Sequence, residues 1–303
     1  MKKKKYKKKM VISCYAALAP QLIGFCVFSV YPVIWVIKYS FTNYNGYASQ
    51  FVGLQNYVRL FLETPEFWQS IGNALILTFM KMALEIPLSF LLAMLLCSDR
   101  LKGKKIFSIL LFLPTVVGAT TASMFFNYMF RTFNGIANNV LEAIGIIDAP
   151  VNWFGEKWWA MCVIIFMSTW MTFAINMMYF CGAISGVPKS VYESAAIDGC
   201  TGINKIFRIT IPMIAPTAKV ILMLALTGSI KMMDEVLLLT KGGPYGSTNV
   251  VMLYLFNKFF GTESSKVHQY GFGAAGAMVV TVLLGFLTVF YLKVTKKADE
   301  LYE

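Results

Sequence analysis

Long apolar runs separated by short polar passages dominate this chain of 303 residues. About 20 helical residues cross the hydrocarbon core of a bilayer, and apolar runs of that length recur along the sequence. The first run follows a series of lysines, as in a signal peptide, but it is too long for one and no small-residue cleavage site follows it. We therefore predict an all-α integral membrane protein that keeps its first helix. The six predicted transmembrane helices cover residues 12–37, 70–97, 106–130, 158–183, 214–238 and 272–293.

Basic residues concentrate in every second polar passage, which explains the net charge of +12 without a nucleic-acid partner. Passages 40–69, 131–157 and 239–271 carry few of them. Because Lys and Arg are retained on the cytoplasmic side, both termini are predicted to be cytoplasmic, and the basic N-terminal tail to touch anionic lipid. The clustered residues are Lys2 to Lys5, Lys7 to Lys9, Arg100, Lys102, Lys104, Lys105, Lys189, Lys205, Arg208, Lys293, Lys296 and Lys297.

Three shorter features refine this picture. The segment Phe51 to Tyr57 is followed by an amphipathic run to Phe67, which predicts a short interfacial helix, with Tyr44, Tyr47, Tyr57 and Trp68 in an aromatic belt. The apolar run 250–260 follows a glycine- and proline-rich turn and is too short to span, so it is predicted to be re-entrant or to lie on the surface. Small residues over 271–277 predict close packing of the last span against a neighbouring helix.

The polar passage after the fourth span contains signals for the start and the end of a short helix. Ser190 and Glu193 have the spacing of a capping box, and Gly199 can adopt the left-handed conformation that ends a helix. The pattern predicts a cytoplasmic helix of about two turns, at 190–198. An ordinary linker between two spans is the alternative.

This passage resembles the EAA loop of ABC importer permeases. The matching features are Glu193, a small pair, Gly199 six residues after the glutamate, and Pro212 where the next span begins. Ser194 stands where the family usually has its first alanine. A second block, Thr240 to Pro244 followed by Ser247-Thr248, resembles the corresponding segment of carbohydrate-importing permeases.

The resemblance implies a type I ABC importer permease fold in a prokaryotic cell membrane. The domains expected are 1–69, a permease domain at 70–293, and a cytoplasmic tail at 294–303; the permease domain contains the EAA loop at 188–212 and an external Gly-Gly-Pro segment at 239–270. In this family the EAA loop is the coupling helix that docks into the ATPase subunit. Its residues here are Tyr192, Glu193, Ser194, Ala195, Ala196, Asp198 and Gly199.

The resemblance also implies partners. They are ABC ATPase subunits that bind ATP and Mg²⁺, an extracytoplasmic solute-binding protein, a sugar, and a second permease, which is expected to be a different chain although a homodimer is an alternative. Family positions that line the substrate pathway fall on Ser168, Met171, Thr172, Ala225, Ser229 and Met232. Several of these are less polar than an asparagine-lined sugar site would be.

Charges inside the spans each need a partner or a function. Lys81 and Glu85 are four residues apart on one helix face, which favours an ion pair. Asp234 could bind a sugar hydroxyl or pair with Lys231, and we place it in the predicted substrate pathway. An ion-coupled secondary transporter would use Lys81, Glu85, Asp234 and Glu235 as a relay. The chain lacks the internal repeat usual in such transporters, and neither that hypothesis nor a membrane scaffold accounts for the docking helix.

The sequence contains no Gly-x-x-x-x-Gly-Lys-Ser/Thr loop, so the chain is predicted not to bind ATP itself. No nucleophile stands beside a base, and no pair of cysteines has zinc-binding spacing. The six cysteines fall in spans or at cytoplasmic positions, which argues against disulfides. His268 is predicted to have a structural or surface role. The sequence thus predicts a transporter subunit without catalytic residues, metal or cofactor of its own.

Overall fold

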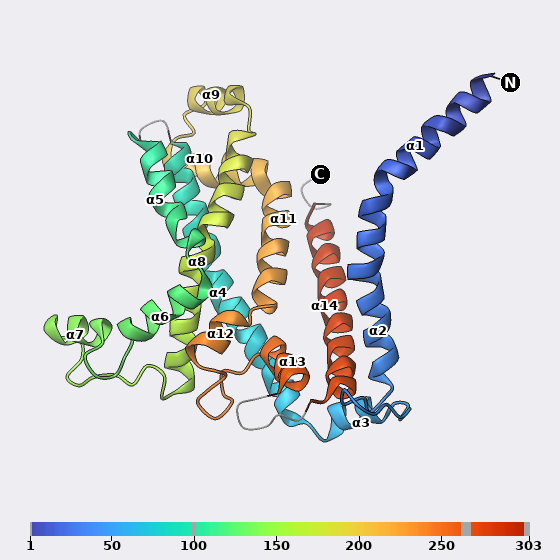
Figure 1. Ribbon diagram of the computed structural model, residues 1–303. Coiled ribbons are helices and arrows are strands. Elements are labelled where there is room, and N and C mark those ends of the chain that lie inside the picture. Colours follow the sequence, from blue (N-terminus) through green and yellow to red (C-terminus); the bar gives the residue numbers. More distant parts are fainter. Residues whose placement is uncertain (1, 99–100, 262–267, 300–303) are drawn as a thin grey trace. The chain divides into compact units, whose positions relative to one another are not determined.

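The computed structural model describes residues 2–98, 101–261 and 268–299, and every regular element in these ranges is helical (Figure 1). Arg100 of the basic passage, residues 262–267 of the external segment and residues 300–303 of the tail lie outside the described residues. The elements are α1 (Lys2–Phe25), η1 (Cys26–Val30), α2 (Tyr31–Ser40), α3 (Gln55–Leu62), α4 (Pro65–Cys97), α5 (Lys104–Val116), α6 (Ala119–Met129), α7 (Ile136–Ala143), α8 (Lys157–Ser185), α9 (Lys189–Ile197), α10 (Gly202–Lys205), η2 (Ile206–Thr210), α11 (Ile211–Ile230), α12 (Asp234–Leu239), α13 (Val251–Phe260) and α14 (Tyr270–Asp299).

Five helical stretches are long and apolar enough to cross a membrane, and α5 with α6 would make a sixth. The predicted span at 106–130 is wrong as a single helix, because α5 and α6 meet at an angle of 93°. Pro114 cannot donate the hydrogen bond that continues a helix, and Val117 and Gly118 are extended. The 13 residues of α5 reach only about 20 Å at the usual rise per residue, which is short of the bilayer core.

The chain divides into two compact units. The first contains Met1–Pro65 and Leu255–Leu283, and the second contains Glu66–Tyr254 and Leu284–Glu303. The functional division expected at residue 69 stays a prediction.

In the first unit, Asn56 fastens the start of α3 to the end of α2. Its side-chain amide donates to the carbonyl oxygens of Ser40 and Thr42 at 2.9 and 2.8 Å. The predicted interfacial helix is wrong in extent, because α3 ends at Leu62 and Phe67 belongs to α4. Pro65 explains the break, since the residue before a proline is disfavoured in helical conformation.

The start of α14 packs closely in the same unit. The Gly271 amide donates to the Tyr44 carbonyl at 2.9 Å, and a Cβ at Gly271 would collide with the Thr42 carbonyl. Gly273 lies against the Phe259 ring of α13. His268 is structural as predicted, because its Nδ1 lies 3.0 Å from the Phe259 carbonyl and its ring stacks on Tyr270.

In the second unit, α4, α8 and α11 enclose an apolar core. Two hydrogen bonds connect α14 to α11. The Tyr291 hydroxyl donates to the Lys219 carbonyl at 2.7 Å, and the Lys219 amine donates to the Thr295 carbonyl at 3.4 Å. The buried core residues are Ala93, Leu96, Phe173, Ala174, Met177, Phe180, Ile184, Val187, Ile214 and Ile221.

Gly271→Ala is expected to destabilise the first unit, because the new methyl group meets backbone that cannot move aside as a flexible side chain would. Gly285→Ala is the matched control, since a Cβ there meets nothing within 4 Å and alanine favours a helix. Thermal unfolding of the detergent-purified chain measures both. A melting temperature for Gly271→Ala equal to that of Gly285→Ala would contradict the close packing.

Candidate functional site

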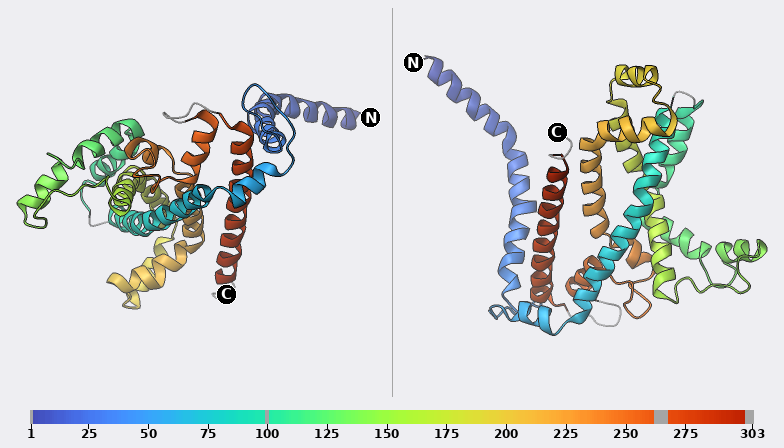
Figure 2. Two further views of the ribbon diagram at one scale, coloured as in Figure 1. Left: turned by 90° about the horizontal axis from the view of Figure 1, so that it is seen from below. Right: turned by 180° about the vertical axis from the view of Figure 1, so that it is seen from behind.

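Helix α9 lies beyond the ends of α5 and α8, separate from the helical bundle of the second unit (Figure 1; Figure 2, right view). It begins at Lys189, so the predicted short helix is present but starts one residue earlier than expected. The predicted capping box is absent, because Pro188 is the N-cap residue and no side chain caps the helix. Ser190 therefore lies inside the first turn, where its hydroxyl cannot act as an N-cap.

The end of α9 agrees with the sequence analysis. Gly199 has a φ of +74°, the left-handed conformation that glycine adopts without strain. The Cys200 amide donates to the Ala195 carbonyl at 2.8 Å and the Gly199 amide to the Ala196 carbonyl at 3.2 Å. This pair of bonds is a Schellman motif, which satisfies the last carbonyl groups of the helix and fixes the direction in which the chain leaves it.

One face of α9 is attached to its own chain through Tyr192 and Ala195. The Lys205 amine lies 4.3 Å from the centre of the Tyr192 ring, and the Tyr192 hydroxyl donates to Thr210 Oγ1 at 3.4 Å. Ala195 is buried. These contacts connect α9 to α10 and to η2, the wide π-helical turn from which α11 begins.

The other face of α9 is open. Glu193, Ser194 and Ala196 are exposed, as are Asp198 and Gly199 just after the helix. The side chain of Ile197 is 87% exposed. The two alanines of the small pair thus differ. Ala195 packs against its own chain, whereas Ala196 is exposed and, with Ile197, gives the open face of α9 a partly apolar surface.

A polar network inside the bundle centres on Glu85 of α4, which is 1% exposed. Its Oε1 accepts hydrogen bonds from Thr172 Oγ1 at 2.7 Å and from Asn176 Nδ2 at 2.8 Å, both on α8. Its Oε2 lies 3.6 Å from the Lys81 amine, which confirms the predicted ion pair. One turn further along α4, the Ser89 hydroxyl donates to the Phe173 carbonyl at 2.9 Å.

The network reaches α12 through Ser168, whose hydroxyl donates to Glu235 Oε1 at 3.2 Å. Within the described residues, Lys231 and Asp234 form no ion pair and both are exposed. The reason is a break in the helix: α11 ends at Ile230 and α12 begins at Asp234, so the two residues do not share a helical face.

The structure divides the residues predicted to line the substrate pathway into three groups. Ser168 and Thr172 donate their hydroxyls to carboxylates of the same chain, whereas Asp234 stays exposed at the first turn of α12. The remaining positions are buried or partly buried: Met171, Ala225, Ser229 and Met232.

The sequence analysis recognised the Lys81–Glu85 pair but missed the role of Glu85 as the centre of a network. The signal was available as two polar series with four-residue spacing: Lys81, Glu85 and Ser89 on α4, and Ser168, Thr172 and Asn176 on α8. Such series follow one face of a helix. What the sequence did not reveal is that the two faces meet.

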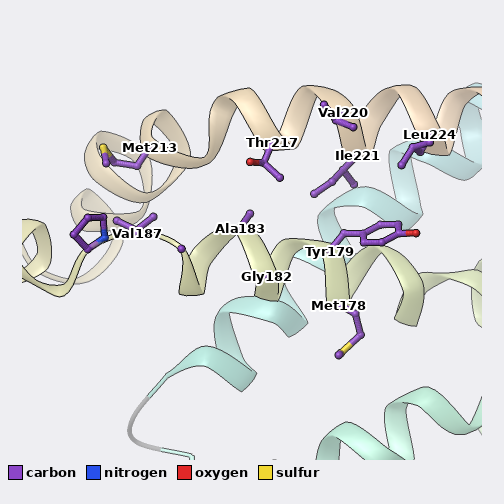
Figure 3. Close-up of a pocket in the computed structure, with 12 residues that line it drawn as sticks. Met178, Tyr179, Gly182, Ala183, Val187, Met213, Thr217, Val220, Ile221 and Leu224 are labelled. Carbon is purple, nitrogen blue, oxygen red and sulfur yellow. The ribbon is translucent and has the colours of Figure 1, made fainter. Parts of the chain in front are cut away.

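An open apolar cavity of about 590 Å³ lies between α8 and α11 at the α9 end of the bundle. Figure 3 shows side chains of the two helices across it, including Tyr179, Thr217 and Ile221. The cavity extends to Val187 and Pro188, where the chain passes into α9. A change in the spacing of α8 and α11 would therefore act directly on the base of α9.

The family model described as "Binding-protein-dependent transport system inner membrane component" matches residues 53–298. The chain belongs to this family of ABC importer permeases. It is a multi-pass membrane transporter subunit and not an enzyme, and the match decides against an ion-coupled secondary transporter. The predicted membership of the ABC importer permease family is thereby confirmed.

Relatives of this permease are similar along nearly their whole length. It is 31% identical to the lactose transport system permease protein LacF of Rhizobium radiobacter, over 89% of this chain and 90% of that protein. It is 30% identical to the arabinooligosaccharides transport system permease protein AraP of Bacillus subtilis, over 93% and 88%. It is also 30% identical to the trehalose/maltose transport system permease protein MalF of Thermococcus litoralis, over 92% of each.

A solved structure confirms the permease fold. A chain of a bacterial ABC transporter involved in the import of the acidic polysaccharide alginate superposes with a TM-score of 0.82 at 23% identity, over 97% of this chain and 98% of that one. A second structure of the bacterial alginate transporter, in complex with an alginate pentasaccharide-bound periplasmic protein, gives a TM-score of 0.83 at 24% identity, over 97% of each chain.

Gly199→Val is expected to uncouple the permease from its energy source while leaving membrane insertion intact. A β-branched residue in left-handed conformation costs about 1–2 kcal/mol, which loosens the end of α9. Gly199→Asn is the control, because asparagine tolerates this conformation and a Cβ at this position meets nothing within 4 Å. Transport by reconstituted vesicles is the measurement, and full activity of Gly199→Val would contradict a role for the rigid helix end.

Lys81→Met is expected to destabilise the permease strongly, because loss of one partner from a buried ion pair costs about 3–5 kcal/mol. The double variant Lys81→Met/Glu85→Gln should recover much of that loss, since it leaves no buried charge at the site. Lys231→Met, at an exposed and unpaired lysine, is the matched control. Melting temperatures of the purified chains decide the matter, and a double variant no more stable than Lys81→Met would exclude coupling between Lys81 and Glu85.

Proposed function

We propose that this permease moves a sugar or an oligosaccharide into the cell, energised by ATP hydrolysis on partner subunits. The observation that carries the proposal is the family match over 53–298 together with the relatives. Three of these are transport system permeases for lactose, arabinooligosaccharides and trehalose/maltose. The chemistry shared by these named substrates is a hydroxyl-rich ring, which polar groups bind through paired hydrogen bonds and apolar faces bind through stacking.

Helix α9 is the proposed coupling element. Its exposed face, with Glu193, Ala196 and Ile197, would fill a cleft of the ATPase subunit, while Tyr192 and Ala195 hold the helix to the bundle. Closure of the ATPase on ATP would displace α9, and the cavity between α8 and α11 provides the space for these helices to move. ATP binding can shift the permease between two conformations only if α9 contacts the ATPase differently in each of them.

The proposed complex contains two ATPase subunits that hold ATP and Mg²⁺, with no nucleotide bound by the permease itself. It also contains a second, homologous permease and an extracytoplasmic solute-binding protein. The family description supports a binding-protein partner. The proposed location is the inner or plasma membrane of a prokaryote, with both termini cytoplasmic, because the lysine-rich passages then lie inside.

For the sugar pathway we propose the region where α8 meets α12. Asp234 is exposed there and offers carboxylate oxygens that accept bonds from hydroxyl groups. Ser168 and Thr172 would act indirectly, by holding the carboxylates of Glu235 and Glu85 in place. Ser229 and Met232 would complete the wall from the end of α11, with Met171 and Ala225 as its apolar part.

Purification of the tagged chain in mild detergent from its native membrane, followed by mass spectrometry, tests the proposal. The expected result is co-purification of an ATPase subunit, a second permease and a binding protein. The binding protein is then screened by thermal shift against lactose, trehalose, maltose and arabinooligosaccharides, where a sugar should raise its melting temperature.

Two results would count against the proposal. Recovery of the chain alone, stable and still transporting, would remove the ATPase coupling. A complete complex whose binding protein responds to a non-carbohydrate solute and to no sugar would remove the substrate class while leaving the coupling in place.

A further inference from the structure

Helix α7 carries an apolar face that nothing in the described part of the chain covers. Ile136 and Val140 lie on one side of the helix, and Ile144, the C-cap residue just after it, continues their four-residue spacing. Their side chains are 44%, 52% and 62% exposed, and Phe133, just before the helix, is 79% exposed. An apolar stripe of this kind normally faces a core or a membrane.

The opposite side of α7 is fixed to its own loop by Asn138, which is 1% exposed. The Asn138 amide nitrogen lies 3.0 Å from the carbonyl oxygens of Thr132 and Val151. Its oxygen accepts a bond from the Trp153 indole at 2.8 Å. These bonds hold the Asn138 side of α7 against its own loop. The apolar side therefore points away from that loop.

The chain on both sides of α7 has the composition of a membrane–water interface. Before it, the Arg131 guanidinium lies 5.1 Å from the Tyr128 ring centre, and after it, the Lys157 amine lies 5.5 Å from that of Trp158. Trp158 and Trp159, at the start of the span α8, are 58% and 43% exposed. Exposed aromatic rings beside basic groups mark the level of the lipid headgroups.

We propose that α7 is an interfacial helix that rests on the membrane surface at the Trp158 end of α8, with Ile136, Val140 and Ile144 inserted among phospholipid chains. In both views of Figure 2, α7 extends away from the other helices of its unit. Its apolar face carries no charge, while Glu142 lies on the other side, where it stays in water. This arrangement is that of an amphipathic helix in the interface plane.

Lipid fits this face better than a protein partner does. The aromatic and basic residues on both sides of α7 are typical of the membrane–water interface, so α7 lies between two interfacial segments. No hydrogen-bonding group lies among the three apolar side chains to orient a protein partner. The helix would then fix the depth at which α8 enters the bilayer. The proposal needs only insertion of the chain in a membrane, so it stands or falls independently of the sugar and of α9.

Site-specific photo-crosslinking in native membranes tests the proposal on the full chain with its partners present. Benzoylphenylalanine replaces Ile144 in one variant and Glu142, two residues away, in the matched control. Leu91, an exposed position on the span α4, is the lipid-facing reference. Mass spectrometry then identifies what each position has captured.

The expected result is a phospholipid adduct at Ile144, comparable to that at Leu91 and several-fold above that at Glu142. A protein adduct at Ile144, with the binding protein or a second permease, would overturn the proposal and assign the face to that partner. Absence of any adduct at Ile144 while Leu91 captures lipid would overturn it as well, because the face would then lie in water.

Discussion

The absence of water inside a bilayer is the constraint on which the bundle depends. A carboxylate in hydrocarbon must be paired and hydrogen-bonded, since nothing else can offset its lost hydration. Glu85 meets this requirement with partners on two helices: Lys81 on its own helix, and Thr172 and Asn176 on α8. The need to satisfy one charge thus fixes how α4 and α8 pack against each other, more specifically than apolar contacts alone would.

The same network occupies only part of the bundle. Ser168 extends the hydrogen-bonded region to Glu235 on α12, so α4, α8 and α12 are joined on the side away from α9. Towards α9, α8 and α11 separate around a cavity that contains no such bonds among its described lining residues. Helix α9 stands beyond that open end, attached through Tyr192, Ala195 and Lys205. Hydrogen bonds therefore fix one part of the bundle, whereas the end next to α9 is held by apolar packing beside an open cavity.

Much of this architecture could be predicted from the sequence. Length and hydropathy located the spans, because the bilayer imposes them directly, and Gly199 identified the end of α9 because few other residues adopt its backbone conformation. The two errors have different causes. The bend after Pro114 lies inside a continuous apolar run, where hydropathy says nothing about the direction of the helix. The break at 231–233 lies beside Lys231, Asp234 and Glu235, three charged residues that the sequence analysis placed inside one span.

Side-chain partners were the other part that the sequence could not supply. The capping box at Ser190 and Glu193 was a local pattern that the path of the chain through Pro188 overrode. The role of Thr172 depended on which face of α4 it meets, and that of Ser168 on where α12 lies. The distinction between Ala195 and Ala196 depended on what lies beneath α9. Each of these is decided by packing between segments distant in sequence.

The wide turn η2 has a consequence for the rotation of α11. A π-helical turn holds one more residue than an α-helical turn, and here it directly precedes Ile211 and Pro212. Because each residue of an α-helix advances the side chains by about 100°, tightening of this one turn would rotate the faces of α11 about its axis without lengthening the span. The base of α11 can therefore act as a rotary joint that changes which of its side chains face the bundle.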